Sequence, residues 1–464
     1  MRAYASTSKW ITAILLAWLP AGGASAQDWP GVPSQQRYAD AEGSISMALA
    51  GDAIITRRVS VFEEGPFTGL VDLVRGATVS IVNLETLFHR FEPDVIPASQ
   101  SGGAYMAADP EMAHELAWMG FDMVARANNH SLDYGIGGME ATTRAVAAAG
   151  IAQAGVGDNL ALARAPAYLE TPGGRVALIS LASTFADQAR AGSQRKDVRG
   201  RPGLNPLRHS AEYVVTTEDL ADLRRVAATL GMGGAQATDR LSFLRAQFRT
   251  GAEPGVVTRA HPTDLEEIVA QVRNARRSAD WVVVTSHTHE RGADRFTPPQ
   301  FLVDFAHAVI DAGADVYFGH GPHVLRGVEI YNGKPIFYSL GNFIFQNETL
   351  DFQPADNYEG WDLPPEALAA DFHDRRAERG TDWSRDVPNW QAIVAVPVFS
   401  SGRLSEVTLH PIGLGFGLAR PQLGRPTLAD PELARDIVRQ LQELSEPFGT
   451  RIDYVDGVGR VRIP

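Results

Sequence analysis

The sequence places metal-ligating residue types directly after five short apolar runs. These residues are Asp52, Glu85, Asn129 with His130, His287 and His320. Open α/β sheets bind their ligands just beyond the carboxyl ends of the strands, which is where these side chains are expected to lie. One such residue alone would be explained by a turn or by a core histidine. Repetition at five strand ends instead predicts a metal site.

The residue types also indicate which metal and which chemistry. The chain contains no cysteine, so any metal must be held by histidine, asparagine and carboxylate groups. A mixed oxygen and nitrogen set of this kind favours Mn, Fe or Zn over Mg or Ca. We expect one or two divalent ions. Two ions about 3.5–4 Å apart would activate a water and hold both the attacking and the leaving oxygen, which is hydrolysis without a side-chain nucleophile.

The elements that must position these side chains alternate between strands and helices. Predicted strands cover Ile45–Leu49, Thr78–Val82, Phe121–Ala125, Val176–Leu181, Trp281–Thr285 and Val316–Phe318. Predicted helices cover Pro110–Met119, Gly138–Ala149, Thr263–Arg276 and Pro299–Ala312. A hairpin is predicted over Val328–Tyr338, because Asn332-Gly333 between two apolar runs is a strong turn signal. This alternation predicts a layered α/β core.

Two segments interrupt that pattern. Residues of about 187–262 and 350–389 are polar and are interpreted as insertions, the first with little sustained hydrophobic periodicity beyond Leu220–Leu230 and Leu241–Phe248. We expect the first insertion to lie outside the sheet as a mobile cover with limited burial. A closing hairpin is predicted over Ala392–Pro411 and a last helix over Asp430–Leu444, so that 419–464 forms a C-terminal helical tail.

Five short motifs in order resemble a known family. They are Gly51-Asp52, Asn83-Leu84-Glu85, Ala127-Asn128-Asn129-His130 with Asp133-Tyr134-Gly135, Gly319-His320-Gly321-Pro322-His323-Val324 and Tyr338-Ser339-Leu340-Gly341-Asn342-Phe343. This series resembles the CapA family, named after the poly-gamma-glutamate capsule protein, over about Ile45–Phe345. That family is similar to calcineurin-like metallophosphoesterases. The resemblance implies a layered αββα metallophosphatase-like sandwich with insertions, in a domain over about 44–418.

The resemblance also implies a role for each matching position. Asp52 would ligate a first metal together with His323, and Glu85 would bridge two metals. Asn129, His287 and His320 would complete the second site. His130 would be the catalytic residue, as a general acid or a phosphate-contacting group.

Several positions depart from the family pattern or leave two interpretations open. Ile54 stands where the wider superfamily usually has a first-site histidine, so the first site is one ligand short. His289 is either an extra ligand or a surface residue. Strand alternation would let it share a side with His287, which is what the ligand interpretation requires. Asn342 either lines the site as a substrate-binding residue or belongs to a structural turn. His89 and His114 are interpreted as surface or structural residues.

The Arg195–Arg201 segment is rich in basic side chains and also has two interpretations. It is either a solvated loop or a cover that binds an anionic substrate, such as a phosphate or a polyglutamate carboxylate. In the second case Arg201 and Arg208 are the substrate-binding candidates.

The first residues resemble an export signal. Arg2 and Lys9 precede a mostly apolar run, Trp10–Leu19. The small residues of Ala24-Ser25-Ala26 suit cleavage before Gln27. The run is about half of the roughly 20 residues needed for a membrane span, and no later segment is apolar enough to be one. We therefore expect a 1–26 signal peptide, cleavage near Ala26 and a periplasmic or secreted protein with no stable membrane span.

The net charge of the chain indicates which classes of binding partner are unfavourable. The whole chain carries −13, and loss of Arg2 and Lys9 would make it −15, which argues against nucleic acid and anionic lipid as partners. The expected partners are a small-molecule or polyanionic polymer substrate and the capsule-synthesis machinery.

Three classes of function are consistent with the sequence. The first is an exported metal-dependent hydrolase of a phosphoester, peptide or polymer bond, in capsule or poly-gamma-glutamate biosynthesis. The second is a non-hydrolytic, polymer-binding component of capsule export. The third is a metal-dependent peptide epimerase, because a Lewis acid beside proton-transfer groups also serves α-carbon deprotonation.

Overall fold

The structure is a computed structural model that describes residues 43–232, 238–379 and 385–464. The expected signal peptide and its cleavage site near Ala26 lie outside these residues. Among the helices in the described ranges, none combines the length and the apolar character that crossing a membrane requires.

Within the described residues the largest sheet has ten strands. Its parallel part contains β1 (Ile45–Ile54), β2 (Val79–Leu84), β5 (Met123–Ala125), β6 (Ala152–Ala154) and β19 (Asn342–Phe345). On the other side of β1 the sheet continues antiparallel through β20 (Gln391–Ser400) and β21 (Arg403–Gly413), the closing hairpin that the sequence predicts. The short strand β22 (Thr427–Leu428) pairs with β21.

The second large sheet has six strands and also has a parallel centre. Its order is β17 (Val328–Tyr331), β18 (Lys334–Phe337), β16 (Val316–His320), β15 (Trp281–His287), β9 (Gly174–Ala182) and β8 (Ala167–Thr171). Strands β18, β16, β15 and β9 run parallel, while β17 and β8 are antiparallel edges. The turn between β17 and β18 is the predicted one, with positive φ at both Asn332 and Gly333.

The two sheets and the helices outside them form four layers. The side chains along each strand point alternately into the core between the sheets and into the core under the helices. Met47 and Leu49 of β1 share one core cluster with Val283 of β15, whereas the intervening Ala48 packs in a different cluster. That outer cluster includes the apolar stripe of α1 (Gly65–Gly76), in which Phe67, Leu70, Val71 and Val74 recur at helical spacing. The two sheets therefore face each other across a shared core.

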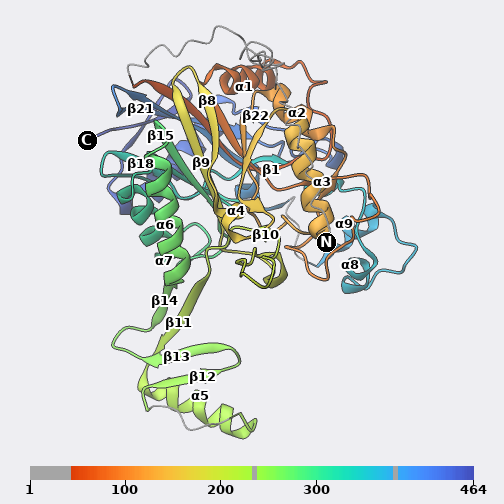
Figure 1. The fold of residues 1–464 in the computed structure, drawn as a ribbon, viewed down its shortest axis with the longest axis vertical. Helices are drawn as coiled ribbons and strands as arrows, with labels where there is room; N and C mark the ends of the chain where they lie inside the picture. The colour runs from red at the N-terminus through yellow and green to blue at the C-terminus, as the bar shows by residue number, and fades with distance from the viewer. Residues whose placement is uncertain (1–42, 233–237, 380–384) are drawn as a thin grey trace, which may run out of the picture. The chain divides into compact units, whose positions relative to one another are not determined.

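Helices cover the outer face of each sheet. Helices α6 (Pro262–Arg276) and α7 (Gln300–Asp311) pack on the six-stranded sheet, and α1, α2 (Met112–Met119) and α3 (Gly135–Ala148) pack on the ten-stranded sheet. Figure 1 shows α6 and α7 together beside β9 and β15. The α/β class and the layered αββα sandwich expected from the sequence are confirmed.

The first insertion is more ordered than the sequence predicts. Strands β12 (Arg240–Phe243), β13 (Ala246–Thr250), β11 (His209–Val215) and β14 (Gly255–Ala260) form a four-stranded sheet with α5 (Thr217–Thr229). Among the described strands, these four pair only with one another, as expected for a segment outside the main sheets. The two short apolar stretches noted in the sequence supply its small core, which contains Leu220, Ala227, Leu241 and Phe243.

The C-terminal helical tail expected over 419–464 contains strands as well as the predicted helix. Helix α10 (Pro431–Ser445) is present, and the Asp430 side chain accepts hydrogen bonds from the backbone N–H groups of Glu432 and Leu433 at its start. The chain then forms a hairpin of β23 (Ile452–Val455) and β24 (Val458–Val461), and β24 pairs with β21. Strands of four residues carry too little periodicity to be distinguished from a loop in the sequence.

The second insertion contains two helices within its described residues. It contains α8 (Ala355–Gly360) and α9 (Ala369–Glu378), and Phe372 of α9 is buried in a cluster with Phe345 and Trp390. The insertion is thereby fixed to the end of β19, one residue of which pairs with Asp52.

Candidate metal centre

Four buried polar side chains meet at the carboxyl ends of the central strands. Asp52 of β1 is paired in register with Asn83 of β2, and His287 of β15 is paired in register with His320 of β16. All four residues are completely buried. Each sheet therefore presents one polar pair to the space between the two sheets.

A bulge in β1 turns Asp52 inward. Alternation alone would place Asp52 on the same face as Ala50, which packs in the outer core. The register of β1 against β2 shifts between Ala50 and Asp52, so that Gly51 is the extra residue and Asp52 turns toward the other sheet. The N–H of Asp52 donates to the carbonyl oxygen of Gly341 at 3.1 Å.

Asp52 is held as a carboxylate by its neighbours. Its Oδ1 lies 3.2 Å from Nδ1 of His320 and 3.5 Å from Nδ1 of His287, and it accepts a 2.8 Å hydrogen bond from Asn83. Its Oδ2 accepts from the N–H of Gly321 at 2.9 Å. Burial by itself raises the pKa of Asp52, but its interactions with the two histidines hold that pKa well below the usual value.

A second ligand group lies next to the first. The second group consists of Glu85, His289 and His323, whose ligand atoms (one carboxylate oxygen and two ring nitrogens) lie within 4.8 Å of one another. The ligand atoms of the first group, Asp52, His287 and His320, lie equally close together. His287 links the groups, because its Nε2 is 3.6 Å from Oε1 of Glu85. Burial, followed by the charges of Asp52 and Asp133, raises the pKa of Glu85 well above its usual value.

The buried polar atoms of this cluster fit a divalent cation. Among the described residues, nothing donates a hydrogen bond to either oxygen of Glu85 or to Oδ1 of Asn129, and Nε2 of His320 likewise lacks a hydrogen-bond partner. A buried carboxylate in that condition is costly to the fold. A cation beside Glu85 would satisfy the lone pairs of that carboxylate, and the donor set of imidazole and carboxylate in the two ligand groups suits Mn, Fe or Zn.

Three histidines of the cluster, His287, His289 and His323, are suited to coordination because burial favours their neutral form. Burial lowers the pKa of His287 to about 4 in spite of the nearby Asp52 carboxylate. Burial also lowers the pKa of His289 and of His323. A neutral imidazole offers a lone pair to a metal, whereas an imidazolium does not.

His323 reaches the cluster through an uncommon backbone conformation. Its φ is +58°, in the left-handed region that residues other than glycine rarely adopt. Its Nδ1 lies 2.7 Å from Oδ1 of Asn342, and this contact orients the ring. Asn342, which the sequence offers as either a lining residue or a turn residue, thus positions His323.

His130 forms a dyad with Asp133 beside Glu85. Its Nδ1 lies 2.7 Å from Oδ2 of Asp133, which also accepts from the N–H of Met106. Its Nε2 is 3.8 Å from Oε1 of Glu85. The carboxylate of Asp133 therefore fixes the ring and directs Nε2 toward the ligand cluster, as the role of a proton donor requires.

The predicted ligands are grouped in the structure in another way than the family resemblance implies. His287 and His320 are grouped with Asp52, and His323 is grouped with Glu85 and His289. The side chain of Ile54 is buried in the apolar cluster with Phe345 and Trp390, so the position is not a ligand.

Arg201 and Arg208 have other partners. Arg208 makes a bidentate ion pair with Asp264, at 2.7 and 2.9 Å, and Asp264 also pairs with the buried Arg164. Arg201 is exposed and donates to the carbonyl oxygen of Arg190. In the part of the chain that the structure describes, no hydrogen bond or ion pair joins either arginine to the ligand cluster, and their substrate-binding role stays a prediction.

Sequence reasoning assigned no role to three residues that organise the site. Asn83 donates to Asp52, Asn128 donates to Oδ1 of Asn83 and to the carbonyl oxygen of Leu84, and Asp133 orients His130. The sequence could have indicated these three residues, because all of them lie in the motifs that contain Glu85, Asn129 and His130.

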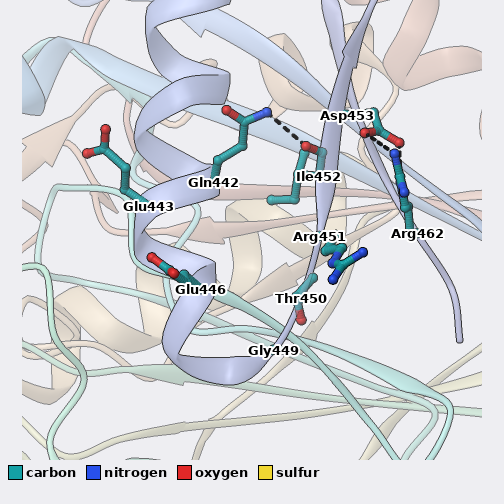
Figure 2. Close-up of a pocket in the computed structure, with 9 residues that line it drawn as sticks. All are labelled: Gln442, Glu443, Glu446, Gly449, Thr450, Arg451, Ile452, Asp453 and Arg462. Atoms are coloured by element: carbon teal, nitrogen blue, oxygen red, sulfur yellow. Dashed lines mark hydrogen bonds and ion pairs between the residues drawn. The ribbon is translucent and has the colours of Figure 1, made fainter.

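A cavity elsewhere on the protein is unrelated to this cluster. A cavity of about 660 Å³ lies between α10 and β23. Figure 2 shows residues that line it, among them Glu443, Glu446 and Arg451. In it Gln442 donates to the carbonyl oxygen of Ile452, and Arg462 pairs with Asp453. None of its lining residues is a residue of the ligand cluster.

The fold and the cluster together define a class of protein. Two facing sheets, covered by helices and carrying a carboxylate, asparagine and histidine cluster at the strand ends, are consistent with the metallophosphoesterase class. Residues 46–347 match the family described as bacterial capsule synthesis protein PGA_cap. The chain belongs to this family.

Curated relatives agree with that assignment. A protein of Sinorhizobium fredii, y4sH, is 38% identical over 430 residues, which cover 90% of this chain and 93% of the relative. The PGA biosynthesis protein CapA of Bacillus subtilis is 25% identical, over 74% of this chain and 72% of its own. The capsule biosynthesis protein CapA of Bacillus anthracis is 24% identical, over 71% of this chain and 64% of its own.

Proposed function

We propose that the chain is an exported, metal-dependent hydrolase that acts in capsule or poly-gamma-glutamate synthesis. The observation that carries the proposal is the Glu85 carboxylate. It is buried within one of the two groups of ligand side chains, 3.6 Å from His287 of the other group, and no described residue donates a hydrogen bond to it. Membership in the capsule synthesis family supports the setting, because two relatives are named for capsule or PGA biosynthesis.

The residues of the cluster divide into ligands and proton-transfer groups. Asp52, Glu85, Asn129, His287, His320 and His323 would hold one or two ions. Divalent metal ions in such a site polarise the oxygen of a phosphoryl or acyl group and activate a water for attack. Asn83 and Asn342 keep Asp52 and His323 in position through the hydrogen bonds described above.

His130 would act as the proton donor to the leaving group of the substrate. Because Nδ1 is engaged by Asp133, a proton on Nε2 would point toward the cluster and could be delivered to the leaving oxygen or nitrogen of a substrate. The burial of Glu85 and His287 keeps bulk water away from this step. The substrate would be a small phosphoester or a bond within a polyanionic polymer.

One observation favours a second candidate. Two relatives are named for capsule or PGA biosynthesis, and one of Mycobacterium tuberculosis is named as a probable polyglutamine synthesis accessory protein. The second candidate is therefore a polymer-binding component of capsule synthesis that does not cut its ligand.

One experiment separates the two candidates. The purified protein is loaded with Mn²⁺ or Zn²⁺ and incubated with aryl phosphomonoesters, aryl phosphodiesters and γ-glutamyl oligomers, with His130→Ala as the matched control. The hydrolase proposal predicts product release from at least one substrate, and a loss of about 10²–10⁴-fold in the control. Saturable binding of the oligomers with no product in either protein would instead support the polymer-binding candidate.

A further inference from the structure

We propose that His289 is a metal ligand, which together with Glu85 and His323 completes the second ion-binding group of this cluster. The inference rests on the metal site of the proposed function and extends it to a residue that the family motifs do not include. It concerns binding of the ion and is independent of whether the protein hydrolyses anything.

The side chains converge on one point. Nε2 of His289 lies 2.9 Å from Nε2 of His287, and that same nitrogen of His287 lies 3.6 Å from Oε1 of Glu85. The ring of His323 packs edge-on against that of His289, with ring centroids 5.3 Å apart. One ligand atom each of Glu85, His289 and His323 lie within 4.8 Å of one another, and imidazole nitrogens and a carboxylate oxygen gathered this closely are typical ligands of a single cation.

The backbone geometry explains why His289 faces inward. The N–H of Thr288 donates to the carbonyl oxygen of His320, which continues the β15–β16 pairing beyond the end of the strands. His287 and His289 therefore share one side of the chain. Thr288 takes the other side, where its hydroxyl lies 3.0 Å from Ser183 and 3.2 Å from Ser286. Of the two interpretations left open by the sequence, the structure favours the inward one.

Hydrogen bonds from other elements hold this segment in place. The hydroxyl of Thr184 accepts from the N–H of His289 at 2.9 Å and donates to Oε1 of Glu290 at 2.9 Å. Ser183 donates to Oε2 of Glu290, and Arg326 donates to its carbonyl oxygen. Partners that orient a ligand in this way preorganise it, because little conformational freedom is left to lose when a metal binds.

Charge also favours a ligand at this position. A single histidine separates Glu85 from each of two other carboxylates: His130 contacts Glu85 and Asp133, and His287 contacts Glu85 and Asp52. A cation beside Glu85 would relieve the repulsion among these carboxylates, and a neutral imidazole from His289 would add a donor without adding a further negative charge. The group Glu85, His289 and His323 then offers one oxygen and two nitrogens, a set suited to Zn, Mn or Fe.

The test measures metal binding directly. Wild type, His289→Ala, His289→Asp and Thr184→Val are stripped with a chelator and titrated with Co²⁺, whose visible absorption reports on its ligands. The metal content after dialysis is then measured by elemental analysis. His114→Ala, at an exposed histidine on α2, is the matched control, and circular dichroism verifies that each variant is folded.

We expect His289→Ala to lose one ion per chain or to bind it about 10–100-fold more weakly, with a changed Co²⁺ spectrum. His289→Asp should recover much of the binding because it restores a donor. Thr184→Val should weaken binding by a smaller factor, and His114→Ala should match wild type. If His289→Ala keeps the stoichiometry, affinity and Co²⁺ spectrum of wild type, or if the wild type binds no metal, the inference is overturned.

The hydrolase proposal can fail without this inference. If metal binding depends on His289 but no substrate is cleaved, the ligand assignment stands and the hydrolase proposal does not. If cleavage persists while His289→Ala binds metal as wild type does, the hydrolase proposal stands and the ligand assignment is refuted.

Discussion

The carbonyl oxygen of Gly341 occupies the space into which any side chain on residue 51 would project. A β-carbon at Gly51 would overlap that oxygen, which at the same time accepts the hydrogen bond from the N–H of Asp52. This close approach of β1 to the Gly341 turn fixes the bulge that points Asp52 at His320. It explains why glycine precedes the aspartate in the first motif.

Replacement of Gly51 by alanine should damage both the fold and the metal site. The added methyl group must push β1 away from Gly341, which we expect to cost about 3 kcal/mol or more of unfolding free energy. Because Asp52 moves with the strand, metal content should fall as well. Gly76→Ala, at the end of α1 with open space around it, is the matched control and should be nearly neutral. An unchanged denaturation midpoint and metal content in Gly51→Ala would refute this account of the bulge.

Replacement of Glu85 by glutamine should remove metal and yet stabilise the metal-free protein. Without a metal, the buried carboxylate lacks hydrogen bonds from the described residues, and its neutral isostere should add about 1–3 kcal/mol of stability at neutral pH. Thermal melts of chelator-treated protein measure this. A variant that is less stable than wild type in the absence of metal would contradict the prediction.

The pH dependence of that difference has a definite sign. Burial raises the pKa of Glu85 in the folded protein above its ordinary value of 4.5, so the metal-free fold holds a proton there that the unfolded chain releases. The stability contributed by this proton is present below pH 4.5 and is lost as the pH rises toward the raised pKa. The advantage of Glu85→Gln should therefore vanish near pH 4 and grow with increasing pH.

Replacement of Arg208 should affect stability rather than substrate affinity. Its bidentate pair helps Arg164 to neutralise the buried Asp264, so Arg208→Ala should cost about 1–2 kcal/mol of unfolding free energy with KM unchanged. Arg201→Ala, which removes only an exposed bond to the Arg190 carbonyl oxygen, is the control for both measurements. A raised KM at unchanged stability would restore the substrate-binding role suggested by the sequence.

Export can be tested on the whole chain. Arg2, Lys9 and the Ala24-Ser25-Ala26 site predict a mature protein that begins near Gln27 and is recovered from the periplasm or the medium. N-terminal sequencing of the recovered protein measures this directly. A cytoplasmic protein that retains Met1 would contradict it.

Much of the fold was predictable because its central elements are long and strongly apolar. The runs that end at Glu85, His287 and His320 are buried parallel strands, and Asn332-Gly333 forms the predicted turn. The elements that were missed are short or polar, such as β23 and β24. Their place in the sheet depends on pairing with β21, a contact distant in sequence that leaves no local pattern.

The sequence predicted Asp52, Glu85, Asn129, His287 and His320 as ligands from residue types at strand ends. The structure brings Asp52, Glu85, His287 and His320 close together, and their role as ligands stays a prediction. Which of them would share an ion depends on the register of β15 with β16 and on the facing of the two sheets. The inward direction of His289 depends on its bond to Thr184, a residue that follows β9. Neither relationship can be read from spacing along the chain.

The metal content of three variants tests the central claim most directly. Wild type, His287→Ala, His320→Ala and His130→Ala are purified, checked for folding and measured by elemental analysis under one loading protocol. The account predicts that His287→Ala and His320→Ala lose metal, while His130→Ala keeps it and loses turnover by about 10²–10⁴-fold. Full metal content in folded His287→Ala and His320→Ala would contradict it.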